Sequence, residues 1–300
     1  MWRVLFFLGV IFGTFGGWAA EPLLPAQPPL FSGDLYRLVN DEGEGYCTDG
    51  ANHYVMFRTH LLKIAADAAF ASGGITLLAS NMNTVAQLTG CNHCGGIKYH
   101  DGLIYCAAEN YQAVGQYAQQ SVALYDATDC HFVASHPISA GRNEASGLAI
   151  IPQAGKHGLI VVTSYDIASA PEARELGLFD LQSFQFLGYL VMNHPLPYMQ
   201  DVCYNPGDDR LYVAASGPNI IAVTLDGTVR EPVHVFDDPK GTYEGLDIWR
   251  QTNVIIEVNS PAAMPGGAVL RSISLAGQTN RNTSETMRRR KVKVKITPPL

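Results

Sequence analysis

HCGGIKYHDGLIYCAA, residues 93–108, carries the pattern that decides the fold. A pair of small residues precedes an apolar strand, an Asp-Gly turn reverses the chain, and a second strand rich in aromatic residues follows. The pattern occurs five times, and its anchor residues are Gly45, Gly96, Gly147, Asp201 and Gly245. The steps between anchors are 51, 51, 54 and 44 residues. A repeat of this length with about four strands is typical of β-propeller blades.

The repeats predict an all-β, five-bladed β-propeller over residues 35–276, with six blades as the alternative. Strand-like segments precede the later anchors, at residues 75–80, 131–138, 186–192 and 229–236. Residues 35–40 (LYRLVN) form a similar segment that has no blade before it. We expect this segment to join the last blade and close the ring, because closure removes the exposed edges of an open array.

The two ends of the chain differ from the repeats in composition. Residues 1–20 place one Arg before an apolar run that ends in small residues, which predicts a secretory signal peptide, with a membrane anchor as the alternative. Residues 21–34 are a Pro-rich linker, and residues 277–300 form a basic tail that we expect to be disordered, an edge strand being the alternative. The sequence therefore predicts a secreted protein, or a periplasmic one in a bacterium, with no membrane contact after cleavage.

An exported chain with an even number of cysteines favours disulfides. The pair Cys91 and Cys94 has the spacing of half a zinc site or of a redox dithiol, but no second pair of that spacing follows. We expect three disulfides among the six residues Cys47, Cys91, Cys94, Cys106, Cys130 and Cys203. Six cysteines allow fifteen pairings, so the connectivity stays open.

The charge of the chain limits its partners. The formal net charge is -7, and the last twenty residues hold seven basic groups and one acid. The remaining body is therefore strongly acidic, which argues against nucleic acid as a partner. It suits a cation or another small-molecule ligand, and an extracellular protein is a further possible partner.

Residues just before the anchors and at the ends of the second strands of a propeller converge on one mouth of its central channel. Carboxylates that meet there repel unless a cation lies among them, and a set of oxygen ligands suits Ca²⁺ better than zinc. We expect Ca²⁺ as the cofactor, with Glu44, Glu144 and Glu244 as its ligands. The expected ligand-binding residues at this mouth are His93, Glu109, Gln200, Asp201 and Asn259.

The segments EASGLAI and YEGLDIW resemble a large group of secreted propellers. The group includes gluconolactonase and senescence-marker proteins, paraoxonase-like hydrolases and relatives of esterase-like phytases. In the gluconolactonase-like family a Glu before a Gly in the first blade binds the catalytic divalent metal, and Glu44-Gly45 fits that place. Asn259 and Asp201 are candidates for the family's other ligands, but the motifs do not fix them. Family members also usually have six blades.

Three functions follow from this reading. The first is a secreted propeller that binds a divalent cation or a small polar ligand at an acidic channel mouth. One alternative is a Ca²⁺-dependent hydrolase of lactones, esters or phosphoesters, and the other is an extracellular protein-binding module. The sequence assigns no catalytic residue, since Ser146 lacks the motif of a nucleophile elbow. Lys98 and Asp247 stand at equivalent positions two past their anchors, where we expect a buried structural pair.

Overall fold

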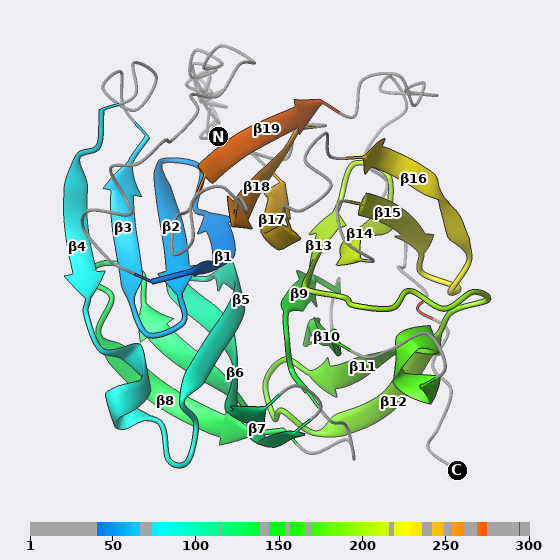
Figure 1. Ribbon diagram of the computed structural model, residues 1–300, viewed down its shortest axis with the longest axis horizontal. Helices are drawn as coiled ribbons and strands as arrows, with labels where there is room; N and C mark the ends of the chain where they lie inside the picture. The colour runs from blue at the N-terminus through cyan, green and yellow to red at the C-terminus, as the bar shows by residue number, and fades with distance from the viewer. Residues whose placement is uncertain are drawn as a thin grey trace, which may run out of the picture.

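The structure is a computed structural model that describes most of the repeat region. The described residues are 41–66, 74–113, 116–138, 144–153, 157–165, 170–215, 219–235, 242–248, 254–260, 269–274 and 294. They form five antiparallel sheets arranged around a common axis (Figure 1). Within these ranges the only helical segments are two 3-10 turns, η1 (Thr84–Gln87) and η2 (Pro171–Arg174). No described helix has the length and hydrophobicity needed to cross a membrane.

Four of the sheets are four-stranded blades whose strands follow the chain order. The first blade consists of β1 (Gly43–Thr48), β2 (Asn52–Phe57), β3 (Leu61–Ala65) and β4 (Leu77–Asn81). The second consists of β5 (His93–His100), β6 (Leu103–Ala113), β7 (Gln116–Asp126) and β8 (Phe132–Pro137). The third consists of β9 (Leu148–Ile151), β10 (Leu159–Val162), β11 (Glu175–Asp180) and β12 (Phe186–Val191). The fourth consists of β13 (Asp201–Asn205), β14 (Arg210–Ala215), β15 (Asn219–Thr224) and β16 (Val229–Val235).

The last sheet has three strands among the described residues. It consists of β17 (Thr242–Ile248), β18 (Val254–Ser260) and β19 (Val269–Ser274). The prediction of five blades, with six as the alternative, is therefore wrong: four blades are complete, and the last sheet has only three strands in the described part of the chain. The sequence predicted a fifth blade completed by the N-terminal segment, but among the described residues this sheet spans only 242–274. The predicted closing strand, residues 35–40, lies outside the described residues.

Apolar residues from adjacent sheets pack into shared clusters. Tyr54 and Met56 of the first blade meet Ile97, Ile104 and Tyr125 of the second, and all five are fully buried. Equivalent clusters join the second blade to the third, the third to the fourth, and the fourth to the three-stranded sheet. Each sheet thus buries its apolar faces against its neighbours, which is the packing expected of propeller repeats. Val294, the one described residue of the basic tail, packs partly buried against the cluster between the third and fourth blades.

The inner strands β1, β5, β9, β13 and β17 surround the axis (Figure 1), and their anchors nearly touch. A Cβ atom on Gly96 would lie 2.2 Å from Asp201 Oδ1 and 2.9 Å from the Cα atom of Gly147. A Cβ atom on Gly245 would lie 2.6 Å from the Cα atom of Gly45. Only glycine permits backbones to approach this closely. We call these four glycines and Asp201 the anchor ring, because together they fill the axis at one level.

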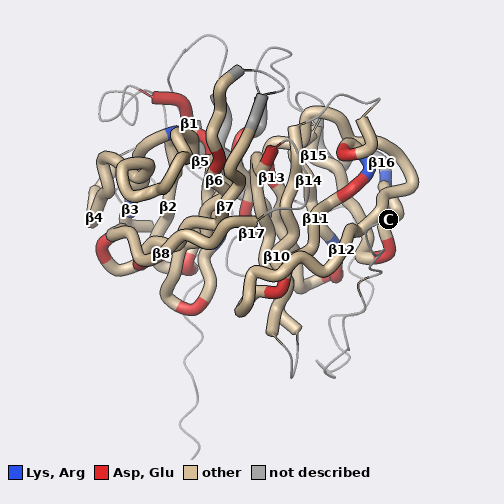
Figure 2. Tube along the Cα trace, turned by 90° about the horizontal axis from the view of Figure 1, so that it is seen from below, with Lys and Arg blue, Asp and Glu red and all other residues tan. Residues whose placement is uncertain are grey.

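The anchor ring separates the two ends of the channel. Residues before the anchors face one end, which we call the front mouth and define by Glu44, His93, Glu109, Glu144 and Glu244. Residues after the anchors face the opposite end. Seen from the side, Asp and Glu residues lie along both edges of the ring of sheets (Figure 2).

Candidate functional site at the front mouth

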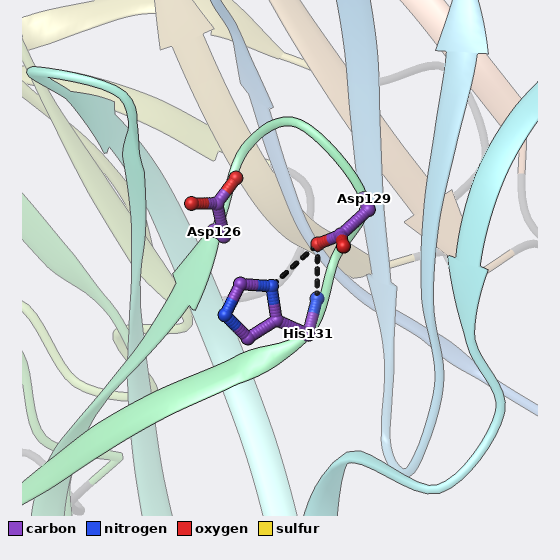
Figure 3. Close-up of side chains that lie close together, drawn as sticks. All are labelled: Asp126, Asp129 and His131. Carbon is purple, nitrogen blue, oxygen red and sulfur yellow. Dashed lines mark hydrogen bonds and ion pairs between the residues drawn. The ribbon is translucent and has the colours of Figure 1, made fainter.

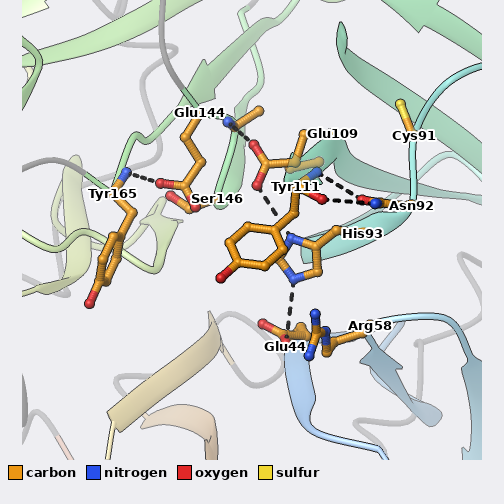
Figure 4. Close-up of polar contacts among 12 residues, drawn as sticks. Glu44, Arg58, Cys91, Asn92, His93, Glu109, Tyr111, Glu144, Ser146 and Tyr165 are labelled. Carbon is orange, nitrogen blue, oxygen red and sulfur yellow. Dashed lines mark hydrogen bonds and ion pairs between the residues drawn. The ribbon is translucent and has the colours of Figure 1, made fainter. Parts of the chain in front are cut away.

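At the front mouth, a histidine lies between two glutamates from different strands (Figure 4). His93 begins β5 and lies opposite Glu109 of β6, whereas Glu44 comes from β1 of the first blade. His93 Nε2 is 3.4 Å from Oε1 of Glu44, and His93 Nδ1 is 3.3 Å from Oε1 of Glu109. The Glu109 side chain is 1% exposed, and the other two are 13% to 15% exposed. The three groups therefore form a largely buried bridge between the first two blades.

This bridge fixes the charge of His93. Burial by itself lowers the pKa of an imidazole, but the hydrogen bonds to Glu109 and Glu44 and their negative charges outweigh it and raise the pKa of His93 to about 11. The ring is therefore an imidazolium at neutral pH. An imidazolium that donates to a carboxylate on each side has no lone pair left to accept a proton, so His93 is unsuited to act as a general base.

One further carboxylate contact joins the second blade to the third, and another lies within the third blade. Oε2 of Glu109 accepts a hydrogen bond of 2.9 Å from the backbone N–H of Ala145. Oε2 of Glu144 accepts one of 2.6 Å from the backbone N–H of Tyr165. Glu144 and Glu244 are 5% and 9% exposed. Glu109 thus helps to hold the second and third blades together, whereas Glu144 bonds within its own blade.

Tyrosine rings lie among these carboxylates. Tyr111 stands two residues past Glu109 on β6, with its ring 6.0 Å from that of His93 and the Arg58 guanidinium 5.8 Å from its centroid. Tyr165 and Tyr198 pack with their ring centroids 5.1 Å apart. Burial and the charges of Glu244 and Glu144 raise the pKa of Tyr165, which places both carboxylates near this ring.

Tyr198 combines exposure with an unusual backbone. Its side chain is 41% exposed, and its φ of 58° lies in the left-handed region that residues other than glycine rarely adopt. Such strained positions often occur at functional sites. Nothing in the sequence predicted the left-handed backbone of Tyr198. Tyr111 was also missed, although the alternation of β6 places it on the same side of the strand as Glu109.

The structure brings the predicted metal ligands to one mouth but not into one tight cluster. Among the described residues, the one group of three potential ligands whose atoms all lie within 4.8 Å of one another is Asp126, Asp129 and His131. That group lies on the turn between β7 and β8, where His131 Nδ1 is 2.6 Å from Oδ1 of Asp129 (Figure 3). Asp129 and His131 are exposed, and exposed acidic turns are common without a metal. Glu44, Glu144 and Glu244 stay predicted ligands, at longer separations.

The remaining predicted ligand residues lie at different depths. Gln200 precedes the anchor ring, and its backbone N–H donates to the carbonyl of Ala214. Asn259 lies on β18, opposite Tyr243 of β17. Asp201 is itself part of the anchor ring and is fully buried. Its carboxylate accepts hydrogen bonds from Lys98 Nζ at 2.7 Å and from the backbone N–H of Leu246 at 2.8 Å. Asp201 therefore lies at the axis below the front mouth, where its carboxylate already has partners within the protein.

The expected pair of Lys98 and Asp247 is replaced by a group of three. Lys98 forms its ion pair with Asp201, and the nearby charge of Asp247 adds to the electrostatic environment. Burial opposes the charged form of Lys98, but Asp201 and Asp247 outweigh it and raise the pKa of this ammonium. Burial is also the main cause that raises the pKa of Asp201 and of Asp247 to about 6. The positions of Lys98 and Asp247 relative to their anchors predicted that both would take part in a buried ion pair. They did not predict that Asp201 would be the partner of Lys98.

The six cysteines all lie in described residues, and all are buried and free. The prediction of three disulfides is therefore wrong for this structure. The cysteines belong to several sheets, where they fill small spaces in the apolar clusters, as Cys47, Cys94 and Cys106 do between the first two blades. Free cysteine packs readily as a small apolar residue, which explains these positions.

Ser146 is held by neighbours that cannot activate it. Its hydroxyl donates to the carbonyl of Met199 at 2.7 Å and lies 2.9 Å from Thr163 Oγ1. Neither partner is a base, so the geometry supports a structural role for this serine at the edge of the mouth.

Comparisons with known proteins do not assign the chain to a family. No family model matches, and no curated protein matches. The resemblance to gluconolactonase-like and paraoxonase-like propellers thus finds no support at the family level. Among solved structures, the chain is similar to a structural genomics protein of unknown function from Bacteroides thetaiotaomicron. The identity is 9%, the TM-score is 0.46, and the match covers 77% of this chain and 69% of that one.

Proposed function

We propose that this protein is a binding β-propeller whose front mouth holds a cation. The observation that carries the proposal is the charge of the mouth. Glu44, Glu109, Glu144 and Glu244 supply four carboxylates, against the imidazolium of His93 and the guanidinium of Arg58. The mouth is therefore negative, and its walls are largely buried, which strengthens its attraction for a cation.

Ca²⁺ is the cation that we propose first. The donors are carboxylate oxygens, with no sulfur among the mouth residues, and calcium accepts flexible sets of oxygen ligands that include water. Because Glu44 neutralises His93, the carboxylates of Glu144 and Glu244 are the ones best placed to contribute charge to the ion. Both carboxylates lie near the Tyr165 ring, where an ion would keep some of its water; a small polar ligand with a positive group is the alternative.

Binding is better supported than hydrolysis. A hydrolase needs a base or nucleophile beside the bound ion. His93 already carries its proton, and the Ser146 hydroxyl is committed to Thr163 and Met199. A further alternative is an extracellular protein-binding module. Such a module would bind its partner through another surface, and calcium would then not change its stability. Export of the protein is proposed on the signal-like composition of residues 1–20 alone.

Thermal unfolding with and without calcium tests this proposal. An ion at a hundredfold excess over its dissociation constant stabilises the folded state by about 2.7 kcal/mol. We expect the melting temperature of the wild type to rise with Ca²⁺ and to fall back with chelator. Glu244→Gln and Glu144→Gln should each reduce the shift, because either change removes a charge and keeps the side-chain shape.

Two control variants locate the effect. Asp101→Asn removes a carboxylate that is 90% exposed, at the turn between β5 and β6, and should keep the full shift. Asp129→Asn disrupts the exposed group on the turn between β7 and β8 and should also keep it. A shift that vanishes in Asp129→Asn but survives in Glu244→Gln would assign calcium to that turn and defeat the proposal. A wild type that responds to neither calcium nor chelator would equally defeat the calcium proposal.

A further inference from the structure

A cavity of about 290 Å³ lies on the opposite side of the anchor ring from the front mouth. All five inner strands contribute to it, each through the residue three past its anchor: Thr48, Tyr99, Ile150, Tyr204 and Ile248. Lys98 and Asp247 also line it, together with Asp49, Gly50, Pro152 and Pro206. We call this space the rear cavity. Its regular construction shows that it belongs to the propeller itself.

Negative groups outnumber positive groups around the rear cavity. Lys98 is 4% exposed, and its ammonium is paired with Asp201, which lies directly behind it. Asp247 lies in the wall, so these three groups together hold two carboxylates and one ammonium. Asp49 adds a further carboxylate, which accepts hydrogen bonds from its own turn and from the Tyr54 hydroxyl. The cavity therefore favours a ligand with positive charge.

The hydrogen bonds that Lys98 and Asp247 make within the protein show which donors and acceptors remain for a ligand. Lys98 Nζ donates to the carbonyl of Ile97 and to Asp201, each at 2.7 Å, which uses two of its three N–H groups. Asp247 accepts one backbone N–H on each oxygen, from Thr48 at 3.0 Å and from Ile248 at 2.8 Å. A carboxylate can accept about four hydrogen bonds. A ligand can therefore donate to Asp247 and accept from Lys98.

We propose that the rear cavity is a second binding site, which takes a small organic amine that also carries hydroxyl groups, such as an amino alcohol or an amino sugar. The amine would pair with Asp247, and a hydroxyl oxygen would accept from Lys98. Tyr99, Tyr204, Pro152 and Pro206 line the cavity and provide apolar contact for the carbon skeleton. A bare metal ion would leave most of the 290 Å³ cavity empty, because even a single water molecule takes up only about 30 Å³.

Titration with two matched sugars tests the inference. Glucosamine is the probe, and glucose is its control, because it replaces the amine with a hydroxyl and keeps the size. Calorimetry or ligand-observed NMR should show glucosamine bound to the wild type at least about tenfold more tightly than glucose, since hydrogen bonds to charged groups are the stronger ones. Asp247→Asn should remove that preference. Ethanolamine, as a smaller member of the class, should compete with glucosamine.

A second variant covers the case in which Asp247→Asn disturbs the fold. Pro152 is exposed at the end of β9, so Pro152→Trp should narrow the cavity without changing its charge or the core. This variant should melt like the wild type and lose glucosamine binding. Glu244→Gln, on the other side of the anchor ring, should bind glucosamine normally whether or not the front mouth holds a cation.

Three outcomes would overturn the inference. One is a wild type that binds neither glucosamine nor ethanolamine at millimolar concentration. Another is binding that both Pro152→Trp and a folded Asp247→Asn leave unchanged, which would place the amine elsewhere. The last is binding that Glu244→Gln abolishes, which would assign the amine to the front mouth.

Discussion

At the scale of one residue, two glutamates of the front mouth keep His93 positively charged. Its two ring nitrogens face Glu44 and Glu109, so both N–H groups of an imidazolium have acceptors. The sequence could place these three residues at the same mouth, because residues just before the anchors and at the ends of the second strands converge there. It could not show that a histidine would lie between the two carboxylates, since this depends on the direction of side chains from two different sheets.

The charge of His93 makes the stability of the protein depend on pH. The pKa of this group is about 11 in the folded protein, against an ordinary value of 6.5. A raised folded-state pKa means that the stabilisation is complete below about pH 6.5 and is lost as the pH rises toward 11. We expect the free energy of unfolding to fall between these values, by up to about 1.4 kcal/mol per pH unit from this one proton.

Denaturant unfolding of the wild type and of His93→Gln across this range measures the effect. The difference between the two proteins isolates His93, because the other titrating groups are shared. Asp201 and Asp247, whose pKa values are raised to about 6, titrate mainly below the range. Parallel pH profiles for the two proteins would contradict the assignment of the imidazolium.

At the scale of the strand, the anchor ring explains why glycine recurs in the sequence. The spacing of the anchors revealed the repeat, and the outer strands expected near residues 131–138, 186–192 and 229–236 are confirmed as β8, β12 and β16. The number of blades could not be read in the same way. A repeat counted from its anchor does not tell how many strands follow, and the last sheet has three among the described residues.

The anchor ring also gives a direct test of the inner-strand packing. Gly96→Ala should destabilise the protein by about 1–3 kcal/mol or more, because the new methyl group meets Asp201 and the Gly147 backbone at less than contact distance. Gly102→Ala is the comparison, since a Cβ atom there meets nothing within 4 Å, although its φ of 81° carries its own smaller strain. Equal melting temperatures for these two variants would argue against close approach at the axis.

At the scale of the whole molecule, the sheets form a frame with a different candidate site at each end of one axis. The positions of acidic residues before the anchors and at the ends of the second strands predicted an acidic mouth, which we define by Glu44, Glu109, Glu144 and Glu244 together with His93. The rear cavity was not predicted, because its wall mixes Thr, Tyr, Ile, Asp and Lys, and no single residue type marks the position three past each anchor. Its existence depends on the ring, which brings these five positions together.

Terbium luminescence tests cation binding at the front mouth most directly, because Tb³⁺ replaces Ca²⁺ and emits when a nearby excited tyrosine transfers energy to it. Tyr111, Tyr165 and Tyr198 lie at this mouth, so excitation of tyrosine should produce terbium emission that added Ca²⁺ displaces. The double variant Glu144→Gln, Glu244→Gln should lose the emission, and Asp129→Asn should retain it. Absence of sensitised emission from the wild type, or emission that only Asp129→Asn abolishes, would contradict a cation site at the front mouth.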